Sequence, residues 1–111
     1  MAYFRCDSGG GTIVDNEFTV LYTRDITDAS SNVSPTISLS EDITEVILIA
    51  ASSYDSTGVK VNSYSDNMTR IYSARCYGYY CASGKIWVFS KKKGQSASIN
   101  FTITGGRLIA R

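Results

Sequence analysis

The residues from Val46 to Ala51 form the longest uninterrupted apolar run of the sequence, and this run limits the possible folds more than any other feature. Val46, Ile47 and Ile49 are β-branched, and β-branching favours an extended backbone over a helix. A short apolar run between polar, turn-prone residues is typical of a strand that is buried on both faces. The run therefore predicts a central strand over residues 45–53.

A helix is the alternative interpretation of the same segment. Ser40 suits a helix N-cap, and the residues after it match the spacing of one apolar helix face, namely Ile43, Val46, Ile47, Ala50 and Ala51. Leu48 and Ile49 would lie off that face, so the strand is the preferred interpretation.

Short apolar segments alternate with polar turns along the whole chain, and no other segment has a helical pattern. We expect strands over 12–23, around Ile37 and Leu39, around Val59 and Val61, over 68–82, over 86–89 and over 97–103, with 107–111 as a closing strand or a tail. Roughly eight short strands of this kind predict an all-β fold, an antiparallel β-sandwich that is jelly-roll-like. The expected core contains Val46, Ile47, Trp87, Phe89, Ile99, Phe101 and Ile103.

The chain is expected to form one domain over residues 12–111, preceded by a flexible N-terminal arm over residues 1–11. Gly9, Gly10 and Gly11 end the arm, and three consecutive glycines disfavour any regular element. Tyr3, Phe4 and Arg5 precede them. Adjacent exposed aromatic side chains favour association, so these three residues are candidates for docking to a partner, although a frayed terminus is the simpler interpretation.

Charge and rare residues argue against several functional classes. Lysine and arginine total 11 residues, and aspartate and glutamate total 10, so no overall field would attract nucleic acid or a membrane. Histidine is absent, which removes the commonest general base and metal ligand. Three cysteines form an odd set and no signal-peptide pattern is present, so we expect free thiols, including Cys76 and Cys81. We predict no catalytic residues, no metal site, no cofactor and no enzymatic activity.

Tyrosine is the most informative residue type, with eight in the chain. Tyrosine suits strand faces, subunit contacts and sugar-stacking surfaces equally well. The candidate ligand or interface residues are Tyr64, Asp66, Tyr77, Tyr79 and Tyr80. The run Lys91–Lys93 is interpreted as a solvated hairpin tip, with binding of an anion as the alternative.

The opening Met1-Ala2-Tyr3-Phe4-Arg5-Cys6, followed by Gly9-Gly10-Gly11, resembles the start of small structural proteins of tailed bacteriophages. The resemblance covers about a dozen residues and brings no catalytic or binding motif. It implies a virion component, such as a capsid decoration, head-fibre or tail-associated protein, that assembles in the host cytoplasm.

Two functions are therefore expected. The first is a non-enzymatic structural protein of the virion that forms a homo-oligomer through its β-domain and docks to other virion proteins by its arm. The alternative is a small carbohydrate-binding module that recognises glycans through its aromatic-rich face.

Overall fold

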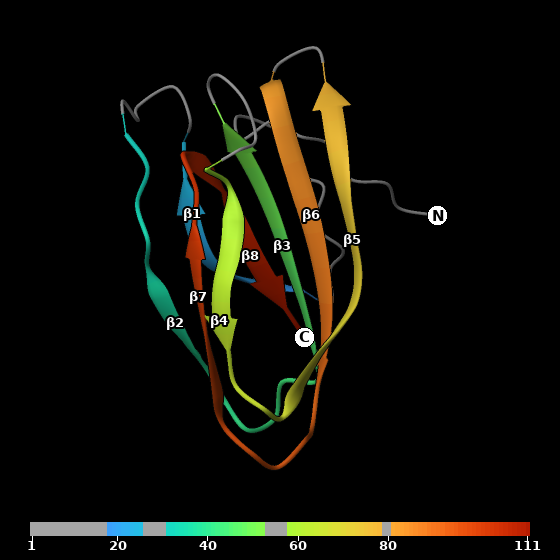
Figure 1. Ribbon diagram of the computed structural model, residues 1–111. Coiled ribbons are helices and arrows are strands. Elements are labelled where there is room, and N and C mark those ends of the chain that lie inside the picture. The colour runs from blue at the N-terminus through green and yellow to red at the C-terminus, as the bar shows by residue number, and fades with distance from the viewer. Residues whose placement is uncertain (1–17, 26–30, 53–57, 79–80) are drawn as a thin grey trace.

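The computed structural model describes residues 18–25, 31–52, 58–78 and 81–111. These residues form eight strands and no helix, arranged as two antiparallel sheets that face each other (Figure 1). The strands are β1 (Thr19–Arg24), β2 (Thr36–Leu39), β3 (Glu45–Ser52), β4 (Lys60–Tyr64), β5 (Met68–Gly78), β6 (Cys81–Lys91), β7 (Ala97–Thr102) and β8 (Gly105–Ala110). The predicted all-β sandwich is confirmed.

The strand order is nested in the manner of a jelly roll. One sheet has the order β1-β8-β3-β6-β5, and the other has the order β2-β7-β4. The first strand therefore pairs with the eighth, the second with the seventh and the third with the sixth. In a regular jelly roll the fourth strand would pair with the fifth. Here β5 pairs with β6 instead, so β4 and β5 belong to different sheets.

The apolar run identified in the sequence is the central strand β3, and the helix interpretation is wrong. β3 pairs with β6 along one side and with β8 along the other. Val46 to Ser52 are all buried, because both faces of this strand are covered. A strand buried on both faces needs continuous apolar character, which explains why the sequence shows no alternation here.

The main core fills the space between the two sheets. Val46, Trp87, Phe89, Ile99, Phe101 and Ile103 belong to it, as predicted. A second and smaller cluster contains Ile47, Ile49, Ile86 and Ile109, against which Phe18 and Val88 pack. Ile47 is buried as predicted, but it belongs to this second cluster. Successive side chains of a strand point to opposite faces, so the second cluster lies on the outer face of the five-stranded sheet.

In the sequence Phe18, Val20 and Tyr22 alternate with Glu17, Thr19 and Leu21, which predicts one buried and one mixed face, but Val20 does not lie on a buried face. The pairing of β1 with β8 shifts register between Val20 and Tyr22, which marks a β-bulge at Leu21. Leu21 and Tyr22 consequently both pack against the main core, and Val20 is exposed.

The lysine run is only partly a solvated tip. Lys92 and Lys93 are exposed, but Lys91 ends β6 and is 5% exposed. Its ammonium group donates a hydrogen bond of 2.7 Å to the carbonyl oxygen of Lys92, and its backbone N–H donates one of 2.8 Å to the carbonyl oxygen of Thr44. The long lysine side chain can be buried because its charged end finds a backbone acceptor.

Residues 107–110 form a strand and not a tail. They belong to β8, which lies between β1 and β3. The two glycines before Arg107 are the first residues of this strand. The backbone N–H of Arg111 also donates to the carbonyl oxygen of Glu45 at 3.0 Å, so the pairing with β3 continues past the end of β8.

Candidate functional site

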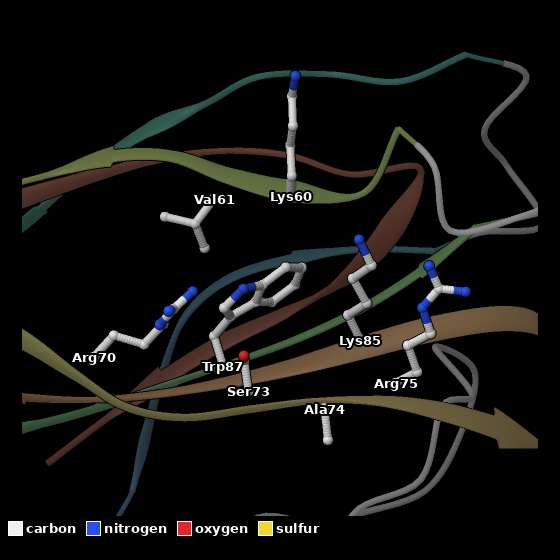
Figure 2. A pocket seen from close by; sticks show the side chains of 8 residues that line it. All are labelled: Lys60, Val61, Arg70, Ser73, Ala74, Arg75, Lys85 and Trp87. Atoms are coloured by element: carbon white, nitrogen blue, oxygen red, sulfur yellow. The ribbon is translucent and has the colours of Figure 1, made fainter.

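A cleft of about 450 Å³ lies where β4 and β5 separate into different sheets (Figure 2). The two strands are joined by a tight turn, in which the N–H of Met68 donates to the carbonyl oxygen of Ser65 at 3.0 Å. Beyond this turn β4 pairs with β7 and β5 pairs with β6, so no ladder of hydrogen bonds closes the space between them. The cleft is thus a consequence of the departure from the regular jelly-roll pairing.

The cleft is lined by four cationic side chains from both sheets. Lys60 comes from β4, Arg70 and Arg75 come from β5, and Lys85 comes from β6. Figure 2 shows the side chains of Arg75 and Lys85 extending side by side, with Arg70 on the other side of Trp87.

The register of β5 and β6 places two of these positive charges directly opposite each other. Arg75 pairs with Lys85, and Ser73 pairs with Trp87 two residues earlier. Residues opposite each other in an antiparallel ladder point to the same face, as do residues two apart on one strand. Like charges in this position destabilise a sheet. Of the residues that the structure describes, none forms an ion pair with any of the four cationic side chains.

The remaining lining is mostly apolar. Trp87 is 6% exposed and belongs to the main core, so only part of its indole ring reaches the cleft. The ammonium nitrogen of Lys85 lies 5.9 Å from the centroid of that ring, within the range of a cation–π interaction. Val61, Ala74 and the hydroxyl-bearing Ser73 also line the cleft, and no carboxylate does so among the residues that the structure describes.

The structure does not bring the predicted site residues together in this cleft. Tyr64 is partly exposed on β4 and packs its ring against Phe89, with 4.9 Å between the ring centroids. Asp66 is exposed in the turn between β4 and β5. Neither residue lines the cleft.

The other predicted residues cannot be placed. Tyr77 belongs to β5, but its side chain lies outside the described part of the structure, as do Tyr79 and Tyr80. Tyr3, Phe4 and Arg5 of the predicted docking arm also lie outside the described residues. Their roles remain predictions.

The four basic residues could not be predicted as a site from the sequence, because they are spread over positions 60 to 85 without a motif. Only the register of the β5–β6 hairpin and the separation of β4 from β5 bring them together. An alignment of the two arms of that hairpin on Gly78 and Cys81, which pair with each other, would place Arg75 opposite Gly84, and only the register shift between Cys76 and Gly78 brings Arg75 opposite Lys85.

The described residues contain no group of three or more His, Cys, Asp or Glu side chains arranged to hold a metal ion. The described residues also contain no helix with the length and apolar character required to span a bilayer.

Comparison of the chain with protein-family models, with curated proteins and with solved structures finds no match. Proposals about function therefore depend on the cleft and on the exposed surfaces.

Proposed function

We propose that this protein is a non-enzymatic binding domain whose cleft binds an anionic saccharide, one that carries carboxylate or sulfate groups. The observation that carries this proposal is the pairing of Arg75 with Lys85 on one face of the sheet, without a carboxylate among the described residues of the lining. An anion bound between these side chains would accept charge-assisted hydrogen bonds from both and would offset their repulsion.

The composition of the cleft favours a saccharide over other anions. Its volume of about 450 Å³ is larger than a single inorganic anion needs and lies within the range of small-molecule sites. Sugars present apolar C–H faces as well as hydroxyl groups, and Val61, Ala74 and Ser73 supply surfaces that match both. A nucleic acid is a poorer match, because the net charge of the chain is +1 and the ring of Trp87 is too buried to stack on a base.

A titration with a sulfated tetrasaccharide, followed by calorimetry, tests this function. The sulfated sugar should bind and its desulfated counterpart should not, and added salt should weaken binding. The double variant R75A/K85A should weaken binding by about tenfold or more, a loss of about 1.4 kcal/mol.

The matched control is K92A/K93A, which removes two positive charges from exposed positions at the β6–β7 hairpin tip. This variant should bind like the unmodified protein. Equal losses in the two variants would show that binding depends only on net charge and would refute a specific cleft.

A second candidate function is supported by a different observation. β5 is an edge strand of the larger sheet, and its Ile71 and Tyr72 are 61% and 56% exposed. A long edge strand with exposed apolar side chains favours pairing with another chain. This surface supports the structural role implied by the resemblance to bacteriophage proteins, in which copies of the chain associate with each other and with other virion proteins.

Solution mass measured by light scattering tests self-association through β5. Ile71→Lys should lower the mass, because it removes an exposed apolar side chain from the association surface. Thr69→Lys is the matched control, since Thr69 is an exposed polar residue of the same strand. If Ile71→Lys leaves the mass unchanged, β5 is not the association surface.

Deletion of residues 1–8 tests the docking arm in the same assay. The domain should stay folded, as judged by its circular dichroism spectrum, but its association should weaken. A truncated protein that associates as well as the full chain would show that Tyr3 and Phe4 make no intermolecular contact.

A further inference from the structure

A bulge in β5 places Arg70 and Arg75 on the same face of the larger sheet. The two residues are five positions apart, and on a regular strand such residues point to opposite faces. The pairing of β5 with β6 shifts register at Ile71, which is an extra residue that β6 does not match. Arg70 therefore pairs with Phe89, and Arg75 pairs with Lys85.

Strand β6 gives the distance between the two arginines. Its pairing with β3 is regular, without a register shift from Lys85 to Phe89. These two residues are four positions apart, so they point to the same face and their Cα atoms lie about 13 Å apart, at about 3.3 Å per residue. The arginines that pair with them are separated by a similar distance.

The cleft consequently has two separate groups of positive charge. Figure 2 shows Arg75 and Lys85 side by side at one end, with Arg70 on the other side of Trp87. Lys60, from the opposite sheet, extends away from both groups (Figure 2). Arg70 and Arg75 are both exposed, so a ligand in the cleft can reach each of them.

The residues between the two groups are uncharged. Ser73 pairs with Trp87, and this pair lies midway along the ladder between the Arg70 position and the Arg75 position. A site with two cationic groups and an uncharged middle is complementary to a ligand whose anionic groups have the same separation.

We propose that the cleft selects a saccharide with two anionic groups about 13 Å apart. One anionic group binds between Arg75 and Lys85, and the other binds Arg70. This separation is greater than the length of one sugar ring, so the two groups belong to different rings of an oligosaccharide. The inference rests on the proposed function and adds the spacing that the ligand must have.

Two trisaccharides of equal charge test this spacing by calorimetry with the full chain. The separated isomer carries one sulfate on each terminal ring, and the clustered isomer carries both sulfates on one terminal ring. The separated isomer should bind about tenfold more tightly, because it alone forms charge-assisted hydrogen bonds at both ends of the cleft. Equal affinities would overturn the inference and leave the proposed function intact, whereas a failure of both isomers to bind would overturn both.

Variants assign the two ends of the cleft. Arg70→Ala should weaken binding of the separated isomer about tenfold and leave the clustered isomer unchanged, so the preference should disappear. R75A/K85A should weaken binding of both isomers. Lys92→Ala is the matched control, since it removes one exposed positive charge outside the cleft and should preserve the preference. Equal losses for the two isomers in Arg70→Ala would overturn the assignment of a second anion-binding group to Arg70.

Discussion

Gly106 lies on β8 where three strands, β1, β8 and β3, pair side by side. It pairs with Arg24 of β1 on one side and with Ala50 of β3 on the other. Its φ angle is 140°, and a Cβ atom at this position would collide with the carbonyl oxygen of Ile49 and lie 2.8 Å from the Cα of Ala50. Both the backbone angle and the close approach therefore require glycine.

Gly106→Ala should lower the free energy of unfolding by about 2–5 kcal/mol, because backbone strain and overpacking each cost about 1–3 kcal/mol. Urea denaturation measures this loss. Gly94→Ala is the control, since Gly94 also has a positive φ of 88° but open space around it. Its loss should be about 1 kcal/mol. Equal losses would show that the contact with β3 is not the cause.

The same glycine shows where prediction from sequence fails at the scale of single residues. Phe101 and Ile103 could be assigned to the core because they alternate with polar neighbours, and this pattern needs no knowledge of the partner strand. Gly105 and Gly106 look like a chain break by the same local rules. Glycine is required at position 106 because β3 lies so close to it. The contacting residues of β3 are some 55 positions earlier in the sequence, so no local sequence pattern indicates this contact.

At the scale of elements, the turn between β2 and β3 contacts the hairpin tip between β6 and β7. The Ser40 hydroxyl donates a hydrogen bond of 2.5 Å to Oδ1 of Asp42, and the N–H of Gly94 donates one of 2.7 Å to the carbonyl oxygen of Glu41. The Ser40 hydrogen bond, the N–H of Asp42 itself and the nearby charges of Lys91 and Lys93 together lower the pKa of Asp42 below its ordinary value.

Ser40→Ala should raise the pKa of Asp42 towards its ordinary value, and a carboxyl titration followed by NMR measures it. Because the pKa is lowered by folding, the stabilisation is complete above the pKa of the unfolded chain, about 3.9. It is lost as the pH falls through the lower folded value, so the effect on stability is confined to acidic conditions. Lys93→Ala should raise the pKa less, since its charge contributes less than the Ser40 hydroxyl. An unchanged pKa in Ser40→Ala would contradict the assigned cause.

The positions of the strands along the chain could be predicted better than the strands with which they pair. The apolar run at β3 and the alternation in β7 identified both strands, because hydrophobic pattern depends on burial alone. The bulge at Leu21 and the pairing of β5 with β6 depend on the neighbouring strand, so they were not predictable. The basic cleft follows from that pairing, which explains why a sequence with balanced charge gave no sign of it.

At the scale of the whole molecule, Phe101 connects the two sheets. It lies on β7 of the smaller sheet, is 0% exposed and packs its ring edge-on against Tyr22 of β1, with 5.6 Å between centroids. The main core contains residues of both sheets, so neither sheet can bury its apolar face without the other.

Phe101→Ala should therefore destabilise the whole domain by about 3–5 kcal/mol. Unfolding followed by fluorescence and by circular dichroism should still show one shared transition. Val20→Ala, at an exposed position of β1, should cost less than about 0.5 kcal/mol. Separate transitions for the two signals, or a loss below about 1 kcal/mol in Phe101→Ala, would mean that the sheets are stable independently.

The position of β8 has a consequence for how the protein is made. β8 follows every other strand in the sequence, yet β1 and β3 each pair with it and not with each other. While the ribosome is still adding residues 105–110, the emerging chain holds β3 with one side unpaired and β1 without any partner. An apolar strand edge that stays open in this way is prone to aggregate. Chains whose translation pauses before Gly105 should therefore depend on chaperones, because their larger sheet cannot close without β8.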